Sequence, residues 1–326
     1  MIRLANISRL NEDLKNLLVV AQEIVLASNQ VMLGKYTKQF EEEVAEFSNA
    51  KYCSVVGSGS DALMYGLMAT DIQNITIPSQ TFIATKNSCE RANINVNFCD
   101  VDTKGCIDWN LLENKQIVTW VGLFGNDTKV PKGIKFVEDG AQHFGLPLKG
   151  TFASYSFDPT KSLPNLGNGG CIVTNNYDIH MNVQDLRRHG KLGKYTGGNS
   201  LMSERDCVEL SVKLKFFDAW KKRRQELANL YKQELTDYVR IITDVKGIVS
   251  KFVIATEKKE QLKCFLLSKD IQCKDVYKHA LDIHKQAMKN CREFLSILCD
   301  SYTTDEEAST VIDTIKTFFE PGPFKT

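Results

Sequence analysis

The sequence of 326 residues has few of the features that mark fibrous, disordered or membrane proteins. It has only 7 Pro and 20 Gly, and its 43% hydrophobic and 25% charged residues are globular averages, which excludes collagen-like and largely disordered chains. The 41 Lys and Arg balance 40 Asp and Glu, so a net charge of +1 gives no overall field for nucleic acid or an anionic membrane. No apolar run approaches the ~20 residues that span a bilayer. The length allows about two domains.

The ten cysteines lack the spacing of a metal or disulfide framework. They form no C-x-x-C pair and have no clustered histidines at zinc spacing. Cys53, Cys171 and Cys264 lie in apolar surroundings, where a reduced thiol packs as a small hydrophobic group. The first 15 residues carry Asn, Glu and Asp where a signal peptide has an apolar stretch. We therefore expect reduced thiols, no metal and a cytoplasmic protein.

Short apolar runs alternate with helical patterns along the first part of the chain. Apolar residues recur at helical spacing over residues 10–27, and a second helix is predicted with Thr37 as its N-cap. Strand-like runs such as NITIP and IKFVEDG then alternate with further helices, which predicts an α/β domain with a mostly parallel sheet. From Glu204 one long charged helix leads to the patterns of a smaller α+β domain. We expect the two domains at residues 1–203 and 204–326.

A Gly/Ser loop joins an apolar run to a predicted helix in residues 55–67, VVGSGSDALMYGL. Gly57 and Gly59 allow a tight turn, and the free amides of Ser60 and Asp61 at the helix start favour an anion such as phosphate. The motif matches neither G-x-G-x-x-G nor the P-loop, so no nucleotide motif is present. A plain strand-to-helix turn is the alternative interpretation.

Two carboxylates, Glu138 and Asp139, end an apolar run within residues 134–145, IKFVEDGAQHFG. Ligands of open α/β sheets bind at such strand ends. A carboxylate there can hold a metal, act as a general base or pair with a protonated ring nitrogen, and Asp139 can equally cap a helix. His143 follows four residues later, but no second His or Cys completes a set of metal ligands.

Lys161 lies in a Ser/Pro/Gly-rich loop within residues 154–174, SYSFDPTKSLPNLGNGGCIVT. A lysine with a lowered pKa is a nucleophile, and it forms Schiff bases with carbonyl compounds such as pyridoxal phosphate. Most loop lysines are only solvated charges. However, a phosphate cradle, a carboxylate for a pyridine nitrogen and a later lysine in one α/β domain are the three protein parts that pyridoxal phosphate needs.

Further motifs follow one another along the chain: GKYTKQFEEEVAEF, GSGSDAL, PSQTFIAT, EDGAQHFG, SFDPTK, LGNGG, RRHG, GGNS and finally CREFLSILCDSYTTDEE. Their order resembles the DegT/StrS family of sugar aminotransferases over nearly the whole chain. The resemblance implies a fold-type I pyridoxal phosphate enzyme, with a large, mostly parallel sheet domain and a smaller C-terminal α+β domain. It also implies a homodimer with active sites at the subunit interface.

The resemblance assigns three residues to the cofactor ring. Lys161 of SFDPTK would bond to the cofactor and shuttle a proton between the amine-bearing carbon and C4′. Asp139 of EDGAQ would keep the pyridine nitrogen protonated, which makes the ring an electron sink. Phe82 of PSQTF would stack on the ring with an offset face contact.

Other residues are assigned to the edges of the cofactor by the same resemblance. Its phosphate contacts map to four residues: Gly59, Ser60, Asp61 and Ser156. Gln142 would lie near the phenolic oxygen of the ring. Asn199 of GGNS would reach into the phosphate site of the neighbouring subunit, so a monomer would be a poor enzyme.

The chain departs from the family pattern on the substrate side. Leu201 replaces an arginine that relatives commonly have after Asn199 and Ser200, and Asp158 stands where relatives often have His or Tyr near the sugar. The stretch between WVGLFG and IKFVEDG has room for a turn but not for the usual helix. These departures leave the identity of the sugar open, but they keep every group that transamination needs.

We therefore expect a ping-pong transamination. An amino donor, with glutamate as the first choice, would convert the cofactor to pyridoxamine phosphate, which would then aminate a nucleotide-linked keto sugar. Family frequency favours a 4-keto-6-deoxyhexose over a 3-keto sugar and leaves the nucleotide open. Two phosphate-bearing ligands need local positive charge, and four basic residues are candidates to supply it: Arg187, Arg188, Lys191 and Lys194. The alternative is that these residues form an exposed, solvated helix end and loop.

Other functions compete with transamination. A sugar dehydratase of the same family replaces the Schiff-base lysine by histidine, and the presence of Lys161 argues against it. A non-catalytic binding or regulatory protein of the same fold would show no turnover even with cofactor bound. A nucleic-acid regulator is disfavoured, because the sequence has neither a helix-turn-helix motif nor an interleaved basic and aromatic stripe.

Overall fold

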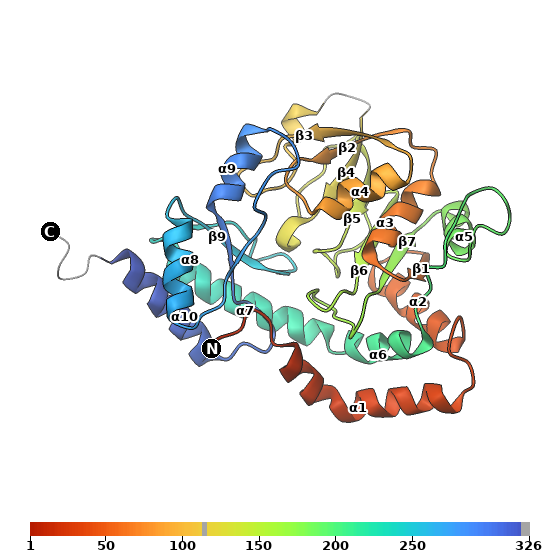
Figure 1. Ribbon diagram of the computed structural model, residues 1–326, viewed down its shortest axis with the longest axis horizontal. Helices are drawn as coiled ribbons and strands as arrows, with labels where there is room; N and C mark the ends of the chain where they lie inside the picture. The colour runs from red at the N-terminus through yellow and green to blue at the C-terminus, as the bar shows by residue number, and fades with distance from the viewer. Residues whose placement is uncertain (113–115, 321–326) are drawn as a thin grey trace.

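The structure is a computed structural model that describes residues 1–112 and 116–320, so the last six residues of the predicted second domain lie outside the described residues. Two β-sheets with their helices make up these ranges (Figure 1). The helices are α1 (Ile7–Ala27), α2 (Lys35–Phe47), α3 (Gly59–Met68), α4 (Ile83–Arg91), α5 (Tyr177–Leu186), α6 (Glu204–Leu214), α7 (Phe217–Leu235), α8 (Lys259–Ser268), α9 (Lys285–Glu293) and α10 (Asp305–Phe319), with short 3-10 helices at Trp109–Leu111 and Leu123–Gly125. The strands are β1 (Tyr52–Val56), β2 (Asn74–Pro78), β3 (Asn95–Cys99), β4 (Ile117–Val121), β5 (Lys135–Asp139), β6 (Phe152–Ser156), β7 (Gly170–Thr174), β8 (Arg240–Ile241), β9 (Phe252–Ala255), β10 (Lys274–Asp275) and β11 (Phe294–Ile297).

The large sheet has seven strands in the order β1-β7-β6-β5-β4-β2-β3. All neighbours from β6 to β3 are parallel, and β7 alone runs antiparallel to both β6 and β1. The mostly parallel α/β sheet predicted from the sequence is therefore confirmed. Because the carboxyl ends of β1, β2, β5 and β6 meet at one edge, the loops that follow these strands meet there as well.

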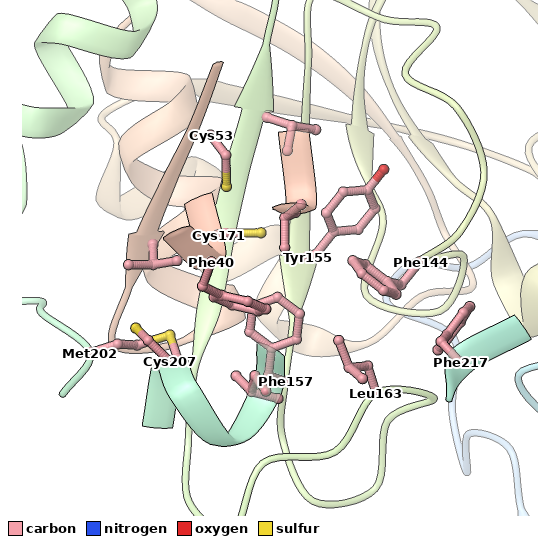
Figure 2. Close-up of a cluster of buried hydrophobic side chains, with 14 of the residues drawn as sticks. Phe40, Cys53, Phe144, Tyr155, Phe157, Leu163, Cys171, Met202, Cys207 and Phe217 are labelled. Carbon is pink, nitrogen blue, oxygen red and sulfur yellow. The ribbon is translucent and has the colours of Figure 1, made fainter. Parts of the chain in front are cut away.

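Strand β6 shows how the packing of the sheet orients the residues at this edge. Alternate side chains of a strand point to opposite faces. Tyr155 and Phe157 enter a buried cluster in which Phe144 packs edge-on against both rings, with centroids 5.1 and 5.7 Å away (Figure 2). Ser156, between them in sequence, is thereby turned to the other face. The aromatic cluster thus fixes the end of β6, which leads into the Lys161 loop.

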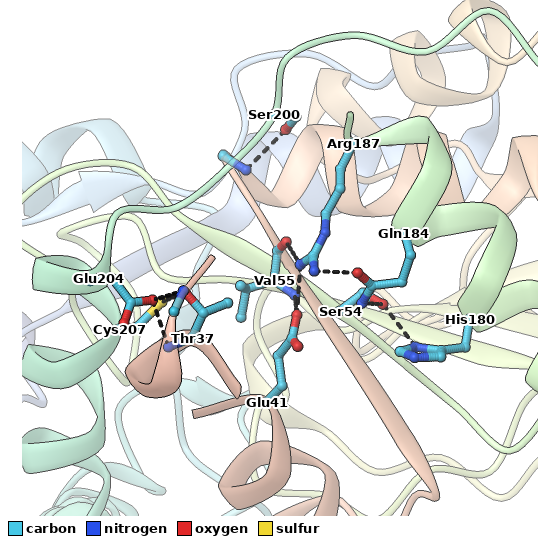
Figure 3. A network of polar contacts seen from close by, with 12 residues as sticks. Thr37, Glu41, Ser54, Val55, His180, Gln184, Arg187, Ser200, Glu204 and Cys207 are labelled. Carbon is cyan, nitrogen blue, oxygen red and sulfur yellow. Dashed lines mark hydrogen bonds and ion pairs between the residues drawn. The ribbon is translucent and has the colours of Figure 1, made fainter. Parts of the chain in front are cut away.

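Helix α2 is held at its start by a buried carboxylate from a distant part of the chain. Glu204 of α6 accepts hydrogen bonds from the amides of Gly34 and Tyr36. It also accepts hydrogen bonds from the amide and the hydroxyl of Thr37 (Figure 3). The prediction of Thr37 as N-cap is therefore wrong, because α2 begins at Lys35 and Glu204 satisfies its free amides.

The small sheet is antiparallel, in the order β10-β11-β9-β8. The single long helix predicted from Glu204 is in fact two helices, since α6 ends at Leu214 and α7 begins at Phe217. Helix α6 packs against α1 and α2, whereas α7 packs against α10 beside the small sheet. The domain boundary after residue 203 stays a prediction.

All ten cysteines lie in the described ranges and are free thiols, as expected. Cys53 and Cys171 are buried, but the prediction for Cys264 is wrong, because that side chain is exposed. Among the described residues, no helix combines the length and the apolar character needed to cross a membrane.

Candidate active site

A cavity of about 600 Å³ lies where the two sheets face one another. This volume is in the usual range for small-molecule sites. Seven of the predicted site residues line it: Gly59, Ser60, Phe82, Asp139, Gln142, Ser156 and Lys161. We call these residues, together with Ser58, the large-sheet wall. We call Ser250, Lys251, Lys274, Asp275 and Tyr277, which line the opposite side, the small-sheet wall.

The start of α3 forms a close-packed cradle against the ends of β6 and β7. Ser58 caps α3 by accepting a hydrogen bond from the Asp61 amide at 3.1 Å. A Cβ on Gly59 would lie 2.5 Å from Cβ of Ser156, and a Cβ on Gly170 would lie 2.5 Å from the carbonyl carbon of Ser58. Only glycine fits at these positions. The first amides of α3 and the Ser156 hydroxyl therefore lie close together, in an arrangement that suits a phosphate group.

Asp61 supports this cradle from behind. Its carboxylate accepts a hydrogen bond from the Ser200 hydroxyl at 2.7 Å and lies 3.8 Å from the Arg91 guanidinium. Ser200 in turn accepts a hydrogen bond from the Gly57 amide at 2.9 Å. Asp61 is not among the residues that line the cavity, and its amide already binds Ser58. The structure thus places Asp61 behind the loop, because Ser200 draws its side chain away from the cavity.

The Asp139 carboxylate is held in place at the end of β5. One oxygen accepts a hydrogen bond from the Thr85 hydroxyl at 2.7 Å, and the other accepts one from the Ala141 amide at 3.2 Å. Thr85 also shares a hydrogen bond of 2.9 Å with Thr81. Sequence reasoning missed Thr85, although the motif PSQTFIAT places its hydroxyl four residues after that of Thr81.

Glu138, the neighbour of Asp139, points to the opposite face of the sheet. It is fully buried, and one of its oxygens accepts a hydrogen bond from the Lys149 amide at 2.7 Å. His143 lies 3.2 Å from the other oxygen and stacks on Trp120. Neither Glu138 nor His143 lines the cavity. Of the carboxylates predicted at this strand end, only Asp139 is therefore available to a ligand there.

Lys161 ends a tight turn on the large-sheet wall. Its amide donates to the Asp158 carbonyl at 2.9 Å, and the Asp158 carboxylate accepts hydrogen bonds from the Thr160 amide and hydroxyl at 2.9 and 2.6 Å. Burial lowers the pKa of the Lys161 ammonium, and nearby Lys274 acts in the same direction, whereas Asp139 and Asp158 raise it. The net lowering increases the neutral fraction of the amine, which is the nucleophilic form.

Two buried cations anchor the loop that follows Lys161. The Arg224 guanidinium donates to the Ser162 carbonyl at 3.0 Å. The Lys213 ammonium donates to the Pro164 carbonyl at 2.9 Å and pairs with Glu209 at 2.7 Å. Sequence reasoning missed both cations, because they come from α6 and α7, far from the loop along the chain.

Phe82 and Gln142 lie on the remaining sides of the large-sheet wall. The Phe82 ring is 58% exposed, which leaves a face free for a planar ligand. The Gln142 side chain accepts a hydrogen bond from the Phe124 amide at 2.9 Å and donates one to the Tyr277 hydroxyl at 3.2 Å. Tyr277 thereby joins the two walls, and sequence reasoning missed it.

The small-sheet wall adds two further lysines. Lys251 precedes β9 and Lys274 lies on β10, next to β11 in the sheet. Burial, Lys161 and Lys274 lower the pKa of Lys251 to about 8, and Asp158 raises it. The ammonium groups of Lys161 and Lys274 therefore both act on that of Lys251.

The cavity does not include the residues that were expected to serve other contacts. Asn199 is exposed and does not line it, so its reach into a partner subunit stays a prediction. The role of Arg187 in ligand binding is wrong, because its buried guanidinium donates to Glu41 at 2.6 Å and to the Val55 carbonyl at 2.7 Å (Figure 3). The other basic candidates, Arg188, Lys191 and Lys194, are exposed and lie outside the cavity lining.

Comparison with known proteins finds relatives along the whole chain. A pleiotropic regulatory protein of Geobacillus stearothermophilus is 28% identical, with 96% of this chain and 97% of that protein covered. A dTDP-3-amino-3,6-dideoxy-alpha-D-galactopyranose transaminase of Aneurinibacillus thermoaerophilus is 28% identical, with 88% and 87% covered. The crystal structure of S. venezuelae DesV in complex with a ketimine intermediate shares the fold, with a TM-score of 0.92, 23% identity and coverage of 98% and 99%.

The motifs that run through the chain also agree with a family description. The sequence model of the DegT/DnrJ/EryC1/StrS aminotransferases matches residues 13–316, a range that contains both walls of the cavity. The resemblance expected from the order of the motifs is therefore confirmed. The chain belongs to the DegT/DnrJ/EryC1/StrS aminotransferase family.

Proposed function

We propose that the protein is a pyridoxal phosphate-dependent aminotransferase that moves an amino group from an amino acid to a nucleotide-linked keto sugar. The observation that carries the proposal is the meeting of Lys161, Asp139 and the α3 cradle in one cavity. Family membership and the sugar transaminase among the relatives support it.

The large-sheet wall has a residue suited to each polar group of this cofactor. The amides of Gly59 and Ser60 and the Ser156 hydroxyl would hold the phosphate, and Asp139 would hold the protonated ring nitrogen. Phe82 would cover one face of the ring, and Gln142 would lie near its phenolic oxygen. When bound, pyridoxal phosphate withdraws electrons from the carbon that gains or loses the amino group.

Lys161 is the group of this chain that can move the proton in the reaction. Because burial lowers the pKa of its ammonium, the neutral form of Nζ is more accessible than it would be in water and can accept a proton from the α-carbon of the donor. Asp139 and Asp158 act in the opposite direction, which keeps the protonated form accessible for the return of that proton. Thr85 holds the Asp139 carboxylate in one orientation, so its charge would stay directed toward the ring nitrogen of a bound cofactor.

The substrates are proposed at the level of chemical class. We expect L-glutamate as donor and a 4-keto-6-deoxyhexose on a nucleotide as acceptor, with a 3-keto sugar as the alternative. The name of the Aneurinibacillus relative places the amino group at C3 of its sugar, which supports the alternative. Mass spectrometry and NMR of the products from 3-keto and 4-keto sugars on dTDP, GDP and UDP will identify the carbon and the nucleotide.

We also propose a cytoplasmic homodimer. Free thiols at all ten cysteines are typical of a reducing compartment. The exposed position of Asn199, outside the cavity of its own chain, supports a contact across a subunit interface. Mixing Lys161→Ala with Asn199→Ala, each of which we expect to be inactive alone, tests this: a shared site predicts recovered activity in mixed dimers, and independent sites predict none.

The absorption spectrum of the protein with pyridoxal phosphate tests the main proposal. We expect a visible band of the lysine-bound cofactor that is absent in Lys161→Ala and present in the exposed control Lys278→Ala. Glutamate should replace this band by the near-ultraviolet band of pyridoxamine phosphate. Absence of the visible band in the wild-type protein would refute the cofactor assignment.

A regulatory protein with the same fold is the second candidate. The Geobacillus relative, which matches nearly the whole chain, is named a pleiotropic regulatory protein. A visible band that no amino acid converts, together with no amination of any keto sugar, would favour this function. Conversion by glutamate would exclude a purely non-catalytic role.

A further inference from the structure

The small-sheet wall presents two ammonium groups, those of Lys251 and Lys274, to the cavity. Lys251 is half-buried and Lys274 is exposed, and both line the cavity. In residues 1–112 and 116–320, neither ammonium group makes a hydrogen bond or an ion pair within 4 Å. Asp275, which follows Lys274, is instead paired with Lys259 and Lys263 of α8.

The carboxylates whose charges act on Lys161 and Lys251 already accept hydrogen bonds from other groups. Asp158 accepts two hydrogen bonds from Thr160, and Asp139 accepts them from Thr85 and Ala141. Ammonium groups that repel one another inside a cavity are costly unless an anion offsets them. Asp158 offsets part of this repulsion without forming an ion pair, and a ligand anion that contacts Lys251 and Lys274 directly would offset the rest.

In the proposed arrangement the phosphate of the cofactor would not supply this anion. The α3 cradle, on the opposite wall, is where a phosphate group fits. A ligand anion on Lys251 and Lys274 would lie near Lys161, because the charge of Lys274 acts on Lys161 and the charges of Lys161 and Lys274 act on Lys251. An amino acid donor has a carboxylate one bond away from the carbon that reacts at Lys161, whereas several bonds separate the keto carbon of a nucleotide sugar from its diphosphate.

We propose that Lys251 and Lys274 form a subsite for a ligand carboxylate, placed opposite the large-sheet wall and next to Lys161. The proposal rests on the proposed function for the identity of the reacting ligand. The carboxylate belongs either to the amino acid donor or to an acidic sugar, and both would pass the same point of the cavity. A lysine ammonium suits this role, because it is a point charge that binds carboxylates of different orientation.

Binding of glutarate tests the subsite without any reaction, because this dicarboxylate lacks an amino group. Isothermal titration calorimetry should show binding to the cofactor-loaded protein, weakened at least about tenfold in Lys251→Gln and in Lys274→Gln. Lys278→Gln, an exposed lysine of the same region that does not line the cavity, is the matched control and should bind like wild type. Lys274 is exposed, so its replacement should leave folding intact.

Two further measurements separate the sources of the carboxylate. A raised KM for glutamate in both variants, with an unchanged visible cofactor band, assigns the subsite to the donor. A raised KM only for a nucleotide-linked uronate, and not for a neutral keto sugar, assigns it to the acceptor. Wild-type values for glutarate, glutamate and the uronate in both variants would overturn the proposal.

Failure of the subsite and failure of the proposed function are distinguishable. If the protein forms the visible band and exchanges amino groups while Lys251→Gln and Lys274→Gln change nothing, only the subsite is wrong. If no visible band forms, glutarate titration of the protein without cofactor still tests the two lysines. Equal binding by wild type and variants, or no binding by wild type, then overturns the subsite as well.

Discussion

The two walls of the cavity are built on different principles. In the large-sheet wall, polar groups are held by neighbours: Asp139 by Thr85, Gln142 by Phe124 and the Lys161 loop by Arg224. In the small-sheet wall, Lys251 and Lys274 have no such partner among the described residues. A cofactor that stays bound needs side chains that are already held in place. A substrate that enters and leaves can instead bind to unpaired charges, because the substrate neutralises these charges when it binds. The comparison indicates a resident cofactor on one wall and exchanging substrates on the other.

The charge of Asp139 is the strongest test of the large-sheet wall. Asp139→Asn keeps the shape of the side chain but removes the charge that would hold the ring nitrogen protonated. We expect the visible cofactor band to persist, because Lys161 is intact, and the rate of amino-group exchange to fall about 100- to 1000-fold. Stopped-flow spectroscopy with glutamate measures that rate. A fall of less than about threefold would show that this wall does not fix the cofactor as described.

A substitution that disturbs the close packing of the α3 cradle should have the next largest effect, on cofactor affinity. In Gly59→Ala the new methyl group would overlap Ser156 and push α3 away from the end of β6. Overpacking of this kind costs about 1–3 kcal/mol, so we expect pyridoxal phosphate affinity to drop about 10- to 100-fold. Fluorescence titration with the cofactor measures this drop.

Gly167→Ala is the control for that experiment. A methyl group on Gly167 would meet no other atom within 4 Å, so this substitution should change neither cofactor affinity nor stability. Equal losses in Gly59→Ala and Gly167→Ala would mean that the loop region tolerates no substitution, and the close contact of Gly59 with Ser156 would not be the cause.

The sequence predicts the large-sheet wall far better than the small-sheet wall. Gly59, Asp139 and Lys161 each lie in a contiguous motif at or directly after the end of a strand, and parallel strands bring such positions to one edge. Lys251 and Lys274 lie in no motif, and they become neighbours of the cavity only through the antiparallel pairing of β9, β11 and β10. Long-range pairing of this kind leaves no periodic pattern in a single sequence.

Because a single sequence carries no signal for long-range contacts, the predictions for Thr37 and Arg187 were also wrong. Thr37 has the side chain of a good N-cap, but a carboxylate 167 residues away along the chain takes that role. Arg187 lies in a basic stretch that looks exposed, yet Glu41 and the Val55 carbonyl bury its guanidinium. Local propensity predicts where elements form, whereas tertiary contacts decide which side chains remain available to a ligand.

The pH dependence of glutarate binding tests the role of Lys251 in the small-sheet wall. The pKa of Lys251 is lowered to about 8 by burial and by Lys161 and Lys274, against the opposing charge of Asp158. Only the ammonium form binds a carboxylate, so affinity should be full below about pH 7 and fall several-fold between about pH 7 and 9. Lys251→Gln should show a flatter profile over this range. A wild-type profile that stays flat throughout that range would contradict the role of Lys251.

The smallest expected effect comes from the support of Asp139. Thr85→Val keeps the volume of the side chain but removes the hydroxyl that donates to the carboxylate at 2.7 Å. Loss of one hydrogen bond to a charged group costs about 1.5–3 kcal/mol when its partner stays buried, and less when water replaces it. Because Asp139 itself lines the cavity, where water can reach it, and keeps its hydrogen bond from the Ala141 amide, we expect only about a fivefold slower exchange rate. Thr85→Ser, which retains the hydroxyl, should recover most of that rate, and a failure to do so would mean that the methyl group of Thr85, through packing, is what positions Asp139.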